Sequence, residues 1–440
     1  MSKFGDISGQ LPINHNEKHS KSLKTVVLVD PISSASKYLT LFKDKYDLVV
    51  VVTLDRSYVE SNFAESLDIA NSEASKVLFC NDVDQTIAQL DGPVDAVVPC
   101  SEPGVIFANL LSSKLKLISN NSADVMALRD KAAMRQIFHK NKVNCPRFIK
   151  AYTVEDALNF SKLASFPLVC KNPLGAGGNL VFMCESEKEL EQAANTILQS
   201  RGLFDESHQY FVVEKHIAGN EFAVNLFNDG KNWNLIDICQ YHFFDDRKLK
   251  HGLLTNIIQL DKKVMNPILL NNLYQLAVKG SEALNIKYGP AHCEIIQNSR
   301  DGELFLIEIG ARIAGANLPW VLYKNNNINL YQKSLDIFLQ GSCEFTPEEI
   351  ACVDKYKRAL MFFYAYEAGD VNNINGCESW KRLPSYFMHT VASNFTLEEP
   401  TEWGDACCLL YLSSKSTLQL QEDVKKARRL FRLNNQSKAA

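Results

Sequence analysis

The sequence predicts an α/β protein of several domains, and three observations lead to that prediction. The chain has 440 residues, and a domain usually takes about 150 residues, so about three domains are expected. Short apolar runs near residues 25, 48 and 96 alternate with helical segments, which is the pattern of a parallel sheet. The chain is 46% apolar and 22% charged, an ordinary composition for a globular protein.

Composition and charge argue against a nucleic-acid binder, a membrane-spanning protein and a secreted protein. The formal net charge is -4, whereas general nucleic-acid binders usually carry a basic excess. The longest apolar runs, such as 48–52, are far shorter than the roughly 18 residues of a membrane span. Residues 1–22 are polar and lack the apolar stretch of a secretion signal. We therefore expect a cytoplasmic protein with no nucleic-acid or membrane partner, and a disordered tail over 1–22.

Strand and helix patterns divide the remaining chain into α/β units. The first unit has strands at 25–30, 48–53 and 96–99, and the turn after Asp30 holds no glycine. The dinucleotide-binding fingerprint is therefore absent, which argues against a dehydrogenase. Ser122 is the expected N-cap of a helix that runs to residue 141. The expected units are 23–120, a helical linker 121–146, 147–216, a strand-rich unit 217–340, and 341–440 with short strands and a final helix near 417–432.

A glycine-rich loop follows an apolar strand in the second unit. Lys171 ends that strand, Gly175, Ala176, Gly177 and Gly178 follow, and a second strand covers 180–184. Glycines allow backbone N–H groups to close on phosphate oxygens, and the lysine adds a positive charge for the same phosphates. The strand–loop–strand context differs from a Walker A loop, which opens a helix. A flexible hairpin turn remains the alternative.

A strand-to-strand bend follows near residue 217. One strand ends at Glu214, the chain bends at Gly219, and the next strand carries Glu221. Such a bend can present backbone groups and a carboxylate to a purine edge and to ribose hydroxyls. The alternative is a surface connection with two solvated glutamates.

Two glutamates are expected to face each other across a hairpin. Residues 300–302 suit a three-residue loop that pairs Ser299 with Glu303, and this register sets Glu294 opposite Glu308. Like charges in that arrangement are destabilising unless a cation lies between them, and a hard divalent cation is the natural occupant. An exposed sheet face is the alternative. The side chains expected on the shared face are those of His292, Glu294, Ile296, Leu306, Glu308, Gly310 and Arg312.

In this order, the segments resemble the ATP-grasp superfamily over residues 24–435, most closely the L-amino acid ligases and related carboxylate–amine ligases. The residues that carry the resemblance are Ser101–Val105, Arg129–Lys131, Lys171 with its glycine loop, Glu214, Glu221, His292–Glu294 and Glu308–Ala316. The resemblance implies a Rossmann-like pre-ATP-grasp domain (23–120), a lid lobe (147–216), a central lobe with the metal site (217–340) and a small C-terminal subdomain (341–440).

The resemblance also implies a role for each matching residue. Lys131 and Lys171 would contact ATP phosphates under the loop Gly175–Gly178, and Glu294 with Glu308 would hold Mg²⁺, or Mn²⁺ in its place. Arg312 would stabilise an acyl phosphate, so Arg312 and Lys171 are the expected catalytic residues. The remaining implied contacts are adenine for Glu214, Lys215, His216 and Ile217, ribose for Glu221, the substrate amino group for Glu102, and the substrate pocket for His251, His292 and Ala316.

Several of these residues have simpler explanations. Lys131 could be a solvated helix lysine, Arg312 could pair with Glu308, Glu102 could cap a helix that begins near Pro103, and His251 could lie on the surface. Gly310 departs from the superfamily pattern, in which Asn is common two residues after the second metal glutamate.

The implied activity is a ligation that joins an amino acid carboxylate to an amine, through an acyl phosphate, with release of ADP and phosphate. The partners are then small-molecule carboxylates and amines, and a homodimer is compatible because members of the family often form dimers. Two alternatives remain. One is another ATP-grasp reaction, either a carboxylation or a ligation to an amine that is not an amino acid, and the other is a nucleotide-binding protein without catalysis.

Overall fold

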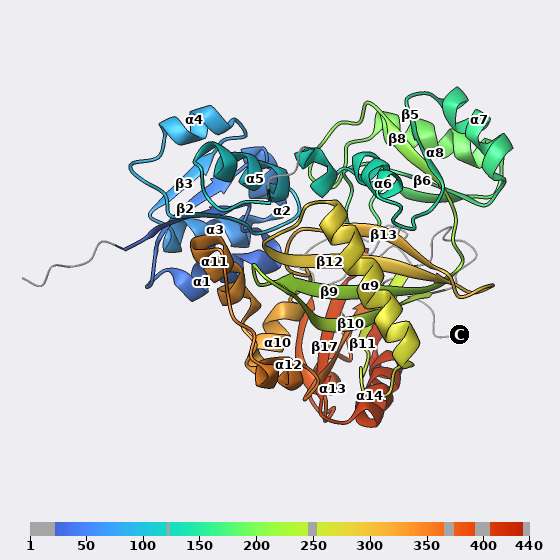
Figure 1. Ribbon diagram of the computed structural model, residues 1–440. Coiled ribbons are helices and arrows are strands. Elements are labelled where there is room, and N and C mark those ends of the chain that lie inside the picture. Colours follow the sequence, from blue (N-terminus) through green and yellow to red (C-terminus); the bar gives the residue numbers. More distant parts are fainter. Residues whose placement is uncertain (1–22, 121–123, 245–252, 365–373, 392–404, 434–440) are drawn as a thin grey trace, which may run out of the picture.

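The computed structural model describes residues 23–120, 124–244, 253–364, 374–391 and 405–433. Figure 1 shows a first α/β region in blue, a small lobe in green above a large central sheet, and the last strands and helices in orange and red below. The predicted α/β class is confirmed. None of the helices in the described ranges combines the length and the apolarity that a bilayer span needs.

The first sheet is parallel, as predicted. Its strands are β1 (Thr25–Val29), β2 (Asp47–Val52), β3 (Lys76–Phe79) and β4 (Ala96–Pro99). They pair in the order β3-β2-β1-β4, and both faces are covered, which explains their nearly continuous apolar runs. The helices of this region are α1 (Lys37–Phe42), α2 (Arg56–Asn62), α3 (Ala64–Glu73), α4 (Val83–Ala88) and α5 (Gly104–Lys114), after a 3₁₀ turn at Ser33–Ser36.

The first region shares its core with a helix from much later in the chain. α11 (Leu330–Gln340) packs against the parallel sheet, and its Tyr331 ring meets the Tyr38 ring edge-on with centroids 5.0 Å apart. The two rings are fully buried, so this contact fixes the first region relative to the central sheet. Figure 1 shows α11 directly beneath the blue strands.

The linker forms one short turn and one helix. A 3₁₀ turn covers Val125–Leu128, and α6 runs from Lys131 to Lys140. The predicted N-cap, Ser122, lies outside the described residues. Asp130 is the observed cap, because its carboxylate accepts from the backbone N–H of Ala133 at 2.8 Å. This cap places Lys131 in the first turn of α6.

The lid lobe is an antiparallel sheet with two helices on one face. Its strands are β5 (Phe148–Ala151), β6 (Leu168–Lys171), β7 (Val181–Cys184) and β8 (Phe211–Lys215), in the order β5-β8-β6-β7. α7 (Val154–Ala164) and α8 (Glu187–Gln199) cover the sheet. The hairpin between β6 and β7 carries the glycine loop, which we define as residues 172–180.

Within the described residues, the central sheet has eight strands. They are β9 (Gly219–Asn228), β10 (Trp233–Phe244), β11 (Leu253–Gln259), β12 (Gly289–Asn298), β13 (Leu304–Gly310), β14 (Lys357–Phe363), β16 (Tyr386–Val391) and β17 (Cys408–Ser414). Their order is β13-β12-β9-β10-β11-β14-β17-β16. Three strands that follow residue 341, β14, β16 and β17, therefore extend the central sheet.

Helices cover the central sheet. α9 (Pro267–Ala283) crosses one face, and Gly280 allows close approach, since a Cβ there would lie 2.2 Å from Cδ2 of Leu306. The face opposite α9 is left to line the site. The remaining elements are α10 (Leu318–Asn326), α12 (Pro347–Val353), α13 (Cys377–Trp380), α14 (Thr417–Leu430) and the two-residue strands β15 (Ile374–Asn375) and β18 (Arg432–Leu433).

Candidate active site

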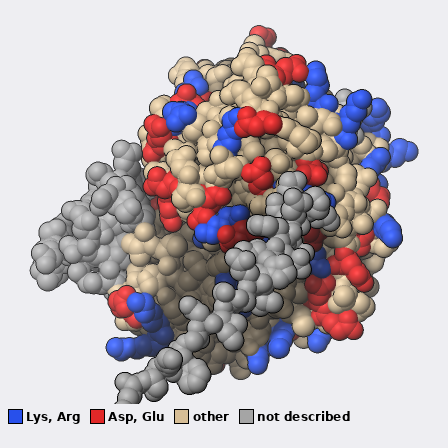
Figure 2. Space-filling view, turned by 90° about the vertical axis from the view of Figure 1, so that its left-hand side faces the viewer, with Lys and Arg blue, Asp and Glu red and all other residues tan. Residues whose placement is uncertain are grey.

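One cleft of about 1620 Å³ lies between the first region, the lid lobe and the central sheet. Every residue predicted for the site that the structure describes lines this cleft, whereas His251 lies outside the described residues. Figure 2 shows a hollowed face with basic and acidic side chains together at its margin. The lining residues from the prediction are Glu102, Lys131, Lys171, Gly175, Ala176, Gly177, Gly178, Glu214, Lys215, His216, Ile217, Glu221, His292, Glu294, Glu308, Arg312 and Ala316.

The glycine loop is a strand–loop–strand turn, as predicted, and its backbone requires glycine. Gly177 and Gly178 have φ angles of +66° and +80°, which side chains rarely adopt. A Cβ on Gly175 would lie 2.9 Å from the carbonyl oxygen of Asn179. Lys131 donates from its Nζ to the carbonyl of Gly175. The loop is therefore held at its base, and its backbone lines the cleft.

Lys171 and Glu214 form a buried ion cluster with Arg135. Lys171 contacts one carboxylate oxygen of Glu214, and Arg135 donates to the other at 3.1 Å. Burial lowers the pKa of the Lys171 ammonium, which Glu214 partly offsets. Burial alone would raise the pKa of Glu214, but Lys171 and Arg135 together hold it below its usual value. The expectation of a solvated Glu214 is therefore wrong. Lys171 and Glu214 line the cleft, and Arg135 is fully buried beside Glu214.

Two backbone N–H groups at the bend after β8 are hydrogen-bonded within the lid lobe. The N–H of Lys215 donates to the Arg147 carbonyl at 2.8 Å, and that of His216 donates to the Pro167 carbonyl at 3.3 Å. Glu221 lies at the start of β9, opposite Ile296 of β12. Burial, and then the charge of Glu294, raises the pKa of Glu221 to about 8. Its carboxylate thus faces a crowded acidic region of the cleft.

Glu294 lies opposite Glu308, as predicted, but for a different reason. The loop has four residues, because the backbone N–H of Asn298 donates to the Glu303 carbonyl at 2.8 Å and Gln297 pairs with Leu304. That pairing alone would place Ile307 opposite Glu294. A bulge at Ile307 restores the register, so Ile295 pairs with Leu306 while Glu294 pairs with Glu308.

The bulge also overturns one prediction about the shared face. Leu306 belongs to the apolar core with Ile295 on the side of α9, so its expected place beside the glutamates is wrong. The side chains of His292, Glu294, Glu308 and Arg312 do line the cleft.

The facing carboxylates fit a magnesium ion that is completed by phosphate. Burial raises the pKa of Glu308. The charges of Glu294 and Glu102 add to this effect, and the charge of Lys131 opposes it. Within the described residues, no group of three or more His, Cys, Asp or Glu side chains could hold a metal ion alone. Mg²⁺ is usually held by one or two carboxylates together with substrate phosphates and water. Two opposed glutamates beside a phosphate-type loop match that donor set.

Two ion pairs connect the parts of the cleft and exclude the simpler explanations for their members. Lys131 is 4% exposed and contacts Glu308 at 3.0 Å, so a solvated Lys131 is wrong. Arg312 contacts Glu102 through its Nε at 2.7 Å, so it does not pair with Glu308, and Glu102 does not cap α5. Glu102 comes from the first region and Arg312 follows β13, which means that the pair spans the cleft.

Gly310 has a local reason to lack a side chain. A Cβ at this position would lie 3.3 Å from Oε2 of Glu102 and 3.5 Å from Cζ of Arg312. An Asn side chain would therefore press on the Arg312–Glu102 pair.

Sequence reasoning did not identify several residues of the site. Arg135 is fully buried beside Glu214. Its spacing of four from Lys131 places both side chains on one helix face, and this spacing was the sequence signal that could have linked Arg135 to the site. Tyr241 of β10 lines the cleft and lies 3.2 Å from Nε2 of His292. Arg358 pairs with Asp237 behind His292; a charge at the start of a buried strand was the signal there.

Comparisons with known proteins agree with this geometry. A model of the ATP-grasp domain matches residues 164–319. An L-arginine-specific L-amino acid ligase of Bacillus subtilis is 24% identical over 298 residues, which are 66% of this chain and 68% of that protein. Dapdiamide A synthase of Enterobacter agglomerans is 24% identical over 274 residues, 60% of this chain and 63% of that protein, or less than two thirds of its length.

A solved structure extends the likeness to nearly the whole chain. The L-amino acid ligase of Bacillus licheniformis superposes with a TM-score of 0.74 at 19% identity, over 94% of this chain and 99% of that one. At this identity the superposition establishes the fold. The matched domain lies within this fold, so the chain carries an ATP-grasp domain over residues 164–319 and has the ATP-grasp fold, with a parallel first sheet and antiparallel lid and central sheets.

Proposed function

We propose that this protein is an ATP-dependent carboxylate–amine ligase that joins an amino acid carboxylate to an amine, most simply that of another amino acid. The observation that carries the proposal is the meeting of three groups in one cleft: the glycine loop with Lys131 and Lys171, the opposed Glu294 and Glu308, and the Arg312–Glu102 pair. The named relatives, an amino acid ligase and Dapdiamide A synthase, support the choice of reaction class.

The phosphate-binding residues would hold ATP so that its terminal phosphate points toward Arg312. Lys131 and Lys171 supply positive charge, and the loop Gly175–Gly178 supplies backbone N–H groups. Glu214, Lys215, His216 and Ile217 would line the base, and Glu221 the ribose. Glu294 and Glu308 would hold Mg²⁺, which offsets negative charge on the phosphates.

The substrate end of the cleft would use the charges of Arg312 and Glu102. Arg312 presents planar donors to a carboxylate and to the oxygen charge that develops when the amine attacks. The pKa of Glu102 lies below its usual value in the folded protein, because the charges of Arg312 and Arg129 outweigh the effect of burial. Glu102 can therefore bind a substrate ammonium group, with His292 and Ala316 beside it.

The lid lobe would keep water from the activated carboxylate, since acyl phosphates hydrolyse. A contact between the lid lobe and the first region supports this role. The hydroxyl of Tyr58 in α2 donates to the Leu203 carbonyl, in the segment between α8 and β8. We propose the units 23–120, 121–146, 147–216, 217–340 and 341–440 as the working parts of this ligase, the last two joined by one sheet.

The test is Mg-ATP turnover against amino acids singly and in pairs, with phosphate release and mass spectrometry of products. Ligation predicts phosphate release that needs two amino acids and a product lighter than their sum by one water. Glu308→Ala should abolish the release, whereas Glu303→Ala, at an exposed position next to the loop of the same hairpin, should not. ATP binding without turnover for every pair would contradict the proposal.

A further inference from the structure

The lining of the cleft changes from charged to apolar across the central sheet. Its Asp, Glu, Lys and Arg side chains come from the first region, the linker, the lid lobe, β9, β12, β13 and the segment that follows β13. Within the described residues, β10, β11, β14 and α10 contribute none of these charged side chains to the lining. We call six residues of this second part the apolar wall: Tyr241, Phe243, Leu254, Ile257, Leu318 and Phe362.

The apolar wall is the surface of a packed core. Leu254, Ile257 and Phe362 are 8%, 7% and 1% exposed and belong to one buried cluster. Tyr241 and Leu318 pack against that cluster, and Tyr241 lies opposite Ile257 on the neighbouring strand. The wall is therefore in place before a ligand binds, as is usual for the apolar part of a small-molecule site.

Phe243 extends this surface into the cleft. Its side chain is 44% exposed, and its ring meets the Tyr241 ring edge-on with centroids 6.5 Å apart. Single exposed apolar side chains are common, but Phe243 continues a packed apolar surface inside a cleft. Such continuous patches are typical of ligand-binding surfaces.

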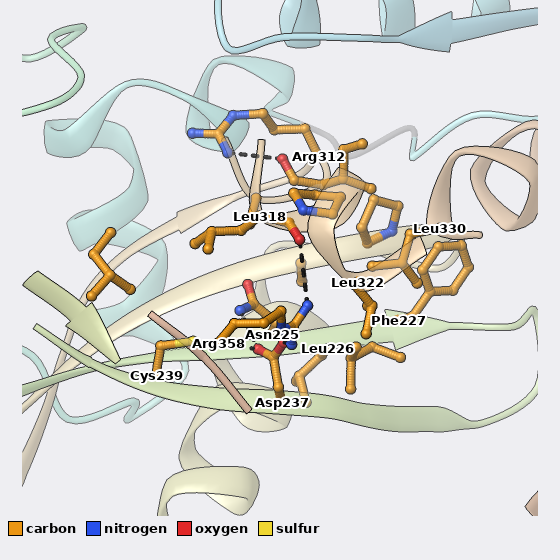
Figure 3. Close-up of a pocket in the computed structure, with 17 residues that line it drawn as sticks. Asn225, Leu226, Phe227, Asp237, Cys239, Arg312, Leu318, Leu322, Leu330 and Arg358 are labelled. Carbon is orange, nitrogen blue, oxygen red and sulfur yellow. Dashed lines mark hydrogen bonds and ion pairs between the residues drawn. The ribbon is translucent and has the colours of Figure 1, made fainter. Parts of the chain in front are cut away.

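The apolar wall reaches the charged end of the cleft at Arg312. A small pocket of about 20 Å³ is lined by Arg312, Ile257 and Leu318 together, and the same three residues line the cleft. Figure 3 shows Leu318 between Arg312 and Cys239 of β10. Because Arg312 pairs with Glu102 at 2.7 Å, a molecule bound at this pair has the apolar wall beside it.

We propose that the apolar wall binds the side chain of the amino acid that the enzyme activates, and that this side chain is large and apolar, either branched aliphatic or aromatic. The assignment rests on the proposed function, in which Arg312 takes the substrate carboxylate and Glu102 its ammonium group. With both polar groups held at one place, the side chain meets the wall. A charged side chain would lose its water there without gaining a counter-charge, which is costly.

Capture of the activated carboxylate by hydroxylamine tests the proposal without knowledge of the amine substrate. Hydroxylamine attacks the acyl phosphate, phosphate leaves, and a hydroxamate forms that can be measured for each amino acid in the presence of Mg-ATP. We expect kcat/KM for L-leucine or L-phenylalanine to exceed that for L-alanine by about 10-fold or more. For L-glutamate and L-arginine it should be lower than for L-leucine by on the order of 100-fold.

Two variants of the exposed Phe243 separate selection by the wall from damage to the fold. Phe243→Ala should lower kcat/KM for L-phenylalanine by about 10-fold and leave that for L-alanine unchanged. Phe243→Asp adds a carboxylate to the wall, so it should raise kcat/KM for L-arginine relative to L-leucine by about 10-fold or more, which general damage would not do. Leu163→Ala is the matched control, since Leu163 is 68% exposed on α7 and outside the cleft lining.

Equal kcat/KM for apolar and charged amino acids would overturn the proposal, and so would unchanged selectivity in both Phe243 variants. Calorimetric titration of the same amino acids into the enzyme with Mg-ADP measures binding without turnover. If apolar amino acids bind best and Phe243→Asp reverses the order, but no hydroxamate forms, the role of the wall stands and the proposed ligase activity falls. Hydroxamate formation without any preference for apolar side chains has the opposite meaning.

Discussion

Replacing Glu214 by Gln should damage the fold far more than replacing Lys171 by Met. Glu214 is the only acidic member of a cluster with Lys171 and Arg135, whose side chains are 5% and 0% exposed. Breaking a buried ion pair from one side costs about 3–5 kcal/mol. Glu214→Gln leaves two buried cations without a counter-charge, so we expect a loss of at least about 3 kcal/mol.

Lys171→Met leaves Glu214 paired with Arg135 and makes the cluster neutral. Met fills a similar volume, and no buried charge is left without a counter-charge, so we expect a clearly smaller loss of stability than for Glu214→Gln. Nucleotide binding should respond differently, because Lys171 is the residue proposed to bind phosphate. Loss of a charge-assisted hydrogen bond of about 1.5–3 kcal/mol weakens ATP binding by on the order of 10- to 100-fold.

Thermal unfolding without nucleotide, and calorimetric titration with a non-hydrolysable ATP analogue, measure the two effects. At about 2 °C per kcal/mol, Glu214→Gln should lower the midpoint by about 6 °C or more. Glu73→Gln, which breaks the surface pair with Lys43, is the control and should leave the midpoint unchanged. A midpoint lower for Lys171→Met than for Glu214→Gln would refute the charge argument.

Three further predictions concern other parts of the site. Gly175→Ala should raise the KM for ATP by roughly tenfold or more, because the new Cβ would meet the loop backbone at 2.9 Å. Gly315→Ala is the control, since a Cβ there has no atom within 4 Å, and its KM should not change. Steady-state kinetics measure both KM values, and an unchanged KM for Gly175→Ala would contradict the role of the loop. Arg312→Lys should lower kcat by on the order of 100-fold without weakening ATP binding, since Lys lacks the planar fork; equal activity would contradict its proposed role. Burial raises the pKa of Asp30 from 3.8 to about 6, although two hydrogen bonds from Thr53 oppose this effect. Between these two pKa values the folded state keeps a proton that the unfolded chain releases. The free energy of unfolding therefore falls by up to about 3 kcal/mol as the pH rises from 3.8 to about 6. Asp30→Asn should therefore gain stability relative to the wild type between pH 4 and pH 6, measured as the difference in thermal midpoint, and a constant difference would contradict the assignment.

Local patterns were sufficient for the parallel first sheet, the glycine hairpin and the facing glutamates. The facing of Glu294 and Glu308 was predicted from a three-residue loop, although the structure reaches it with a four-residue loop and a bulge at Ile307. Both routes end in the same register, and sequence alone does not distinguish them, because a bulge depends on how the strand packs against α9.

Contacts between distant residues were beyond the sequence. Arg312 and Glu102 are 210 positions apart, and Arg358 and Asp237 are 121 apart. Each of these side chains has a plausible local role, such as a helix cap or a solvated charge, and only the folded chain brings the partners together. The same holds for Arg135: its spacing from Lys131 places both on one helix face, but only the folded chain brings Arg135 to Glu214, 79 positions later.

Transfer of oxygen-18 from substrate to phosphate tests the central claim most directly. An amino acid labelled in its carboxylate oxygens is incubated with Mg-ATP and its amine partner, and the released phosphate is analysed by mass spectrometry. If the carboxylate is activated as an acyl phosphate, one labelled oxygen appears in each phosphate that accompanies product. Product formation with unlabelled phosphate would contradict the acyl-phosphate route, and with it the role assigned to the cleft.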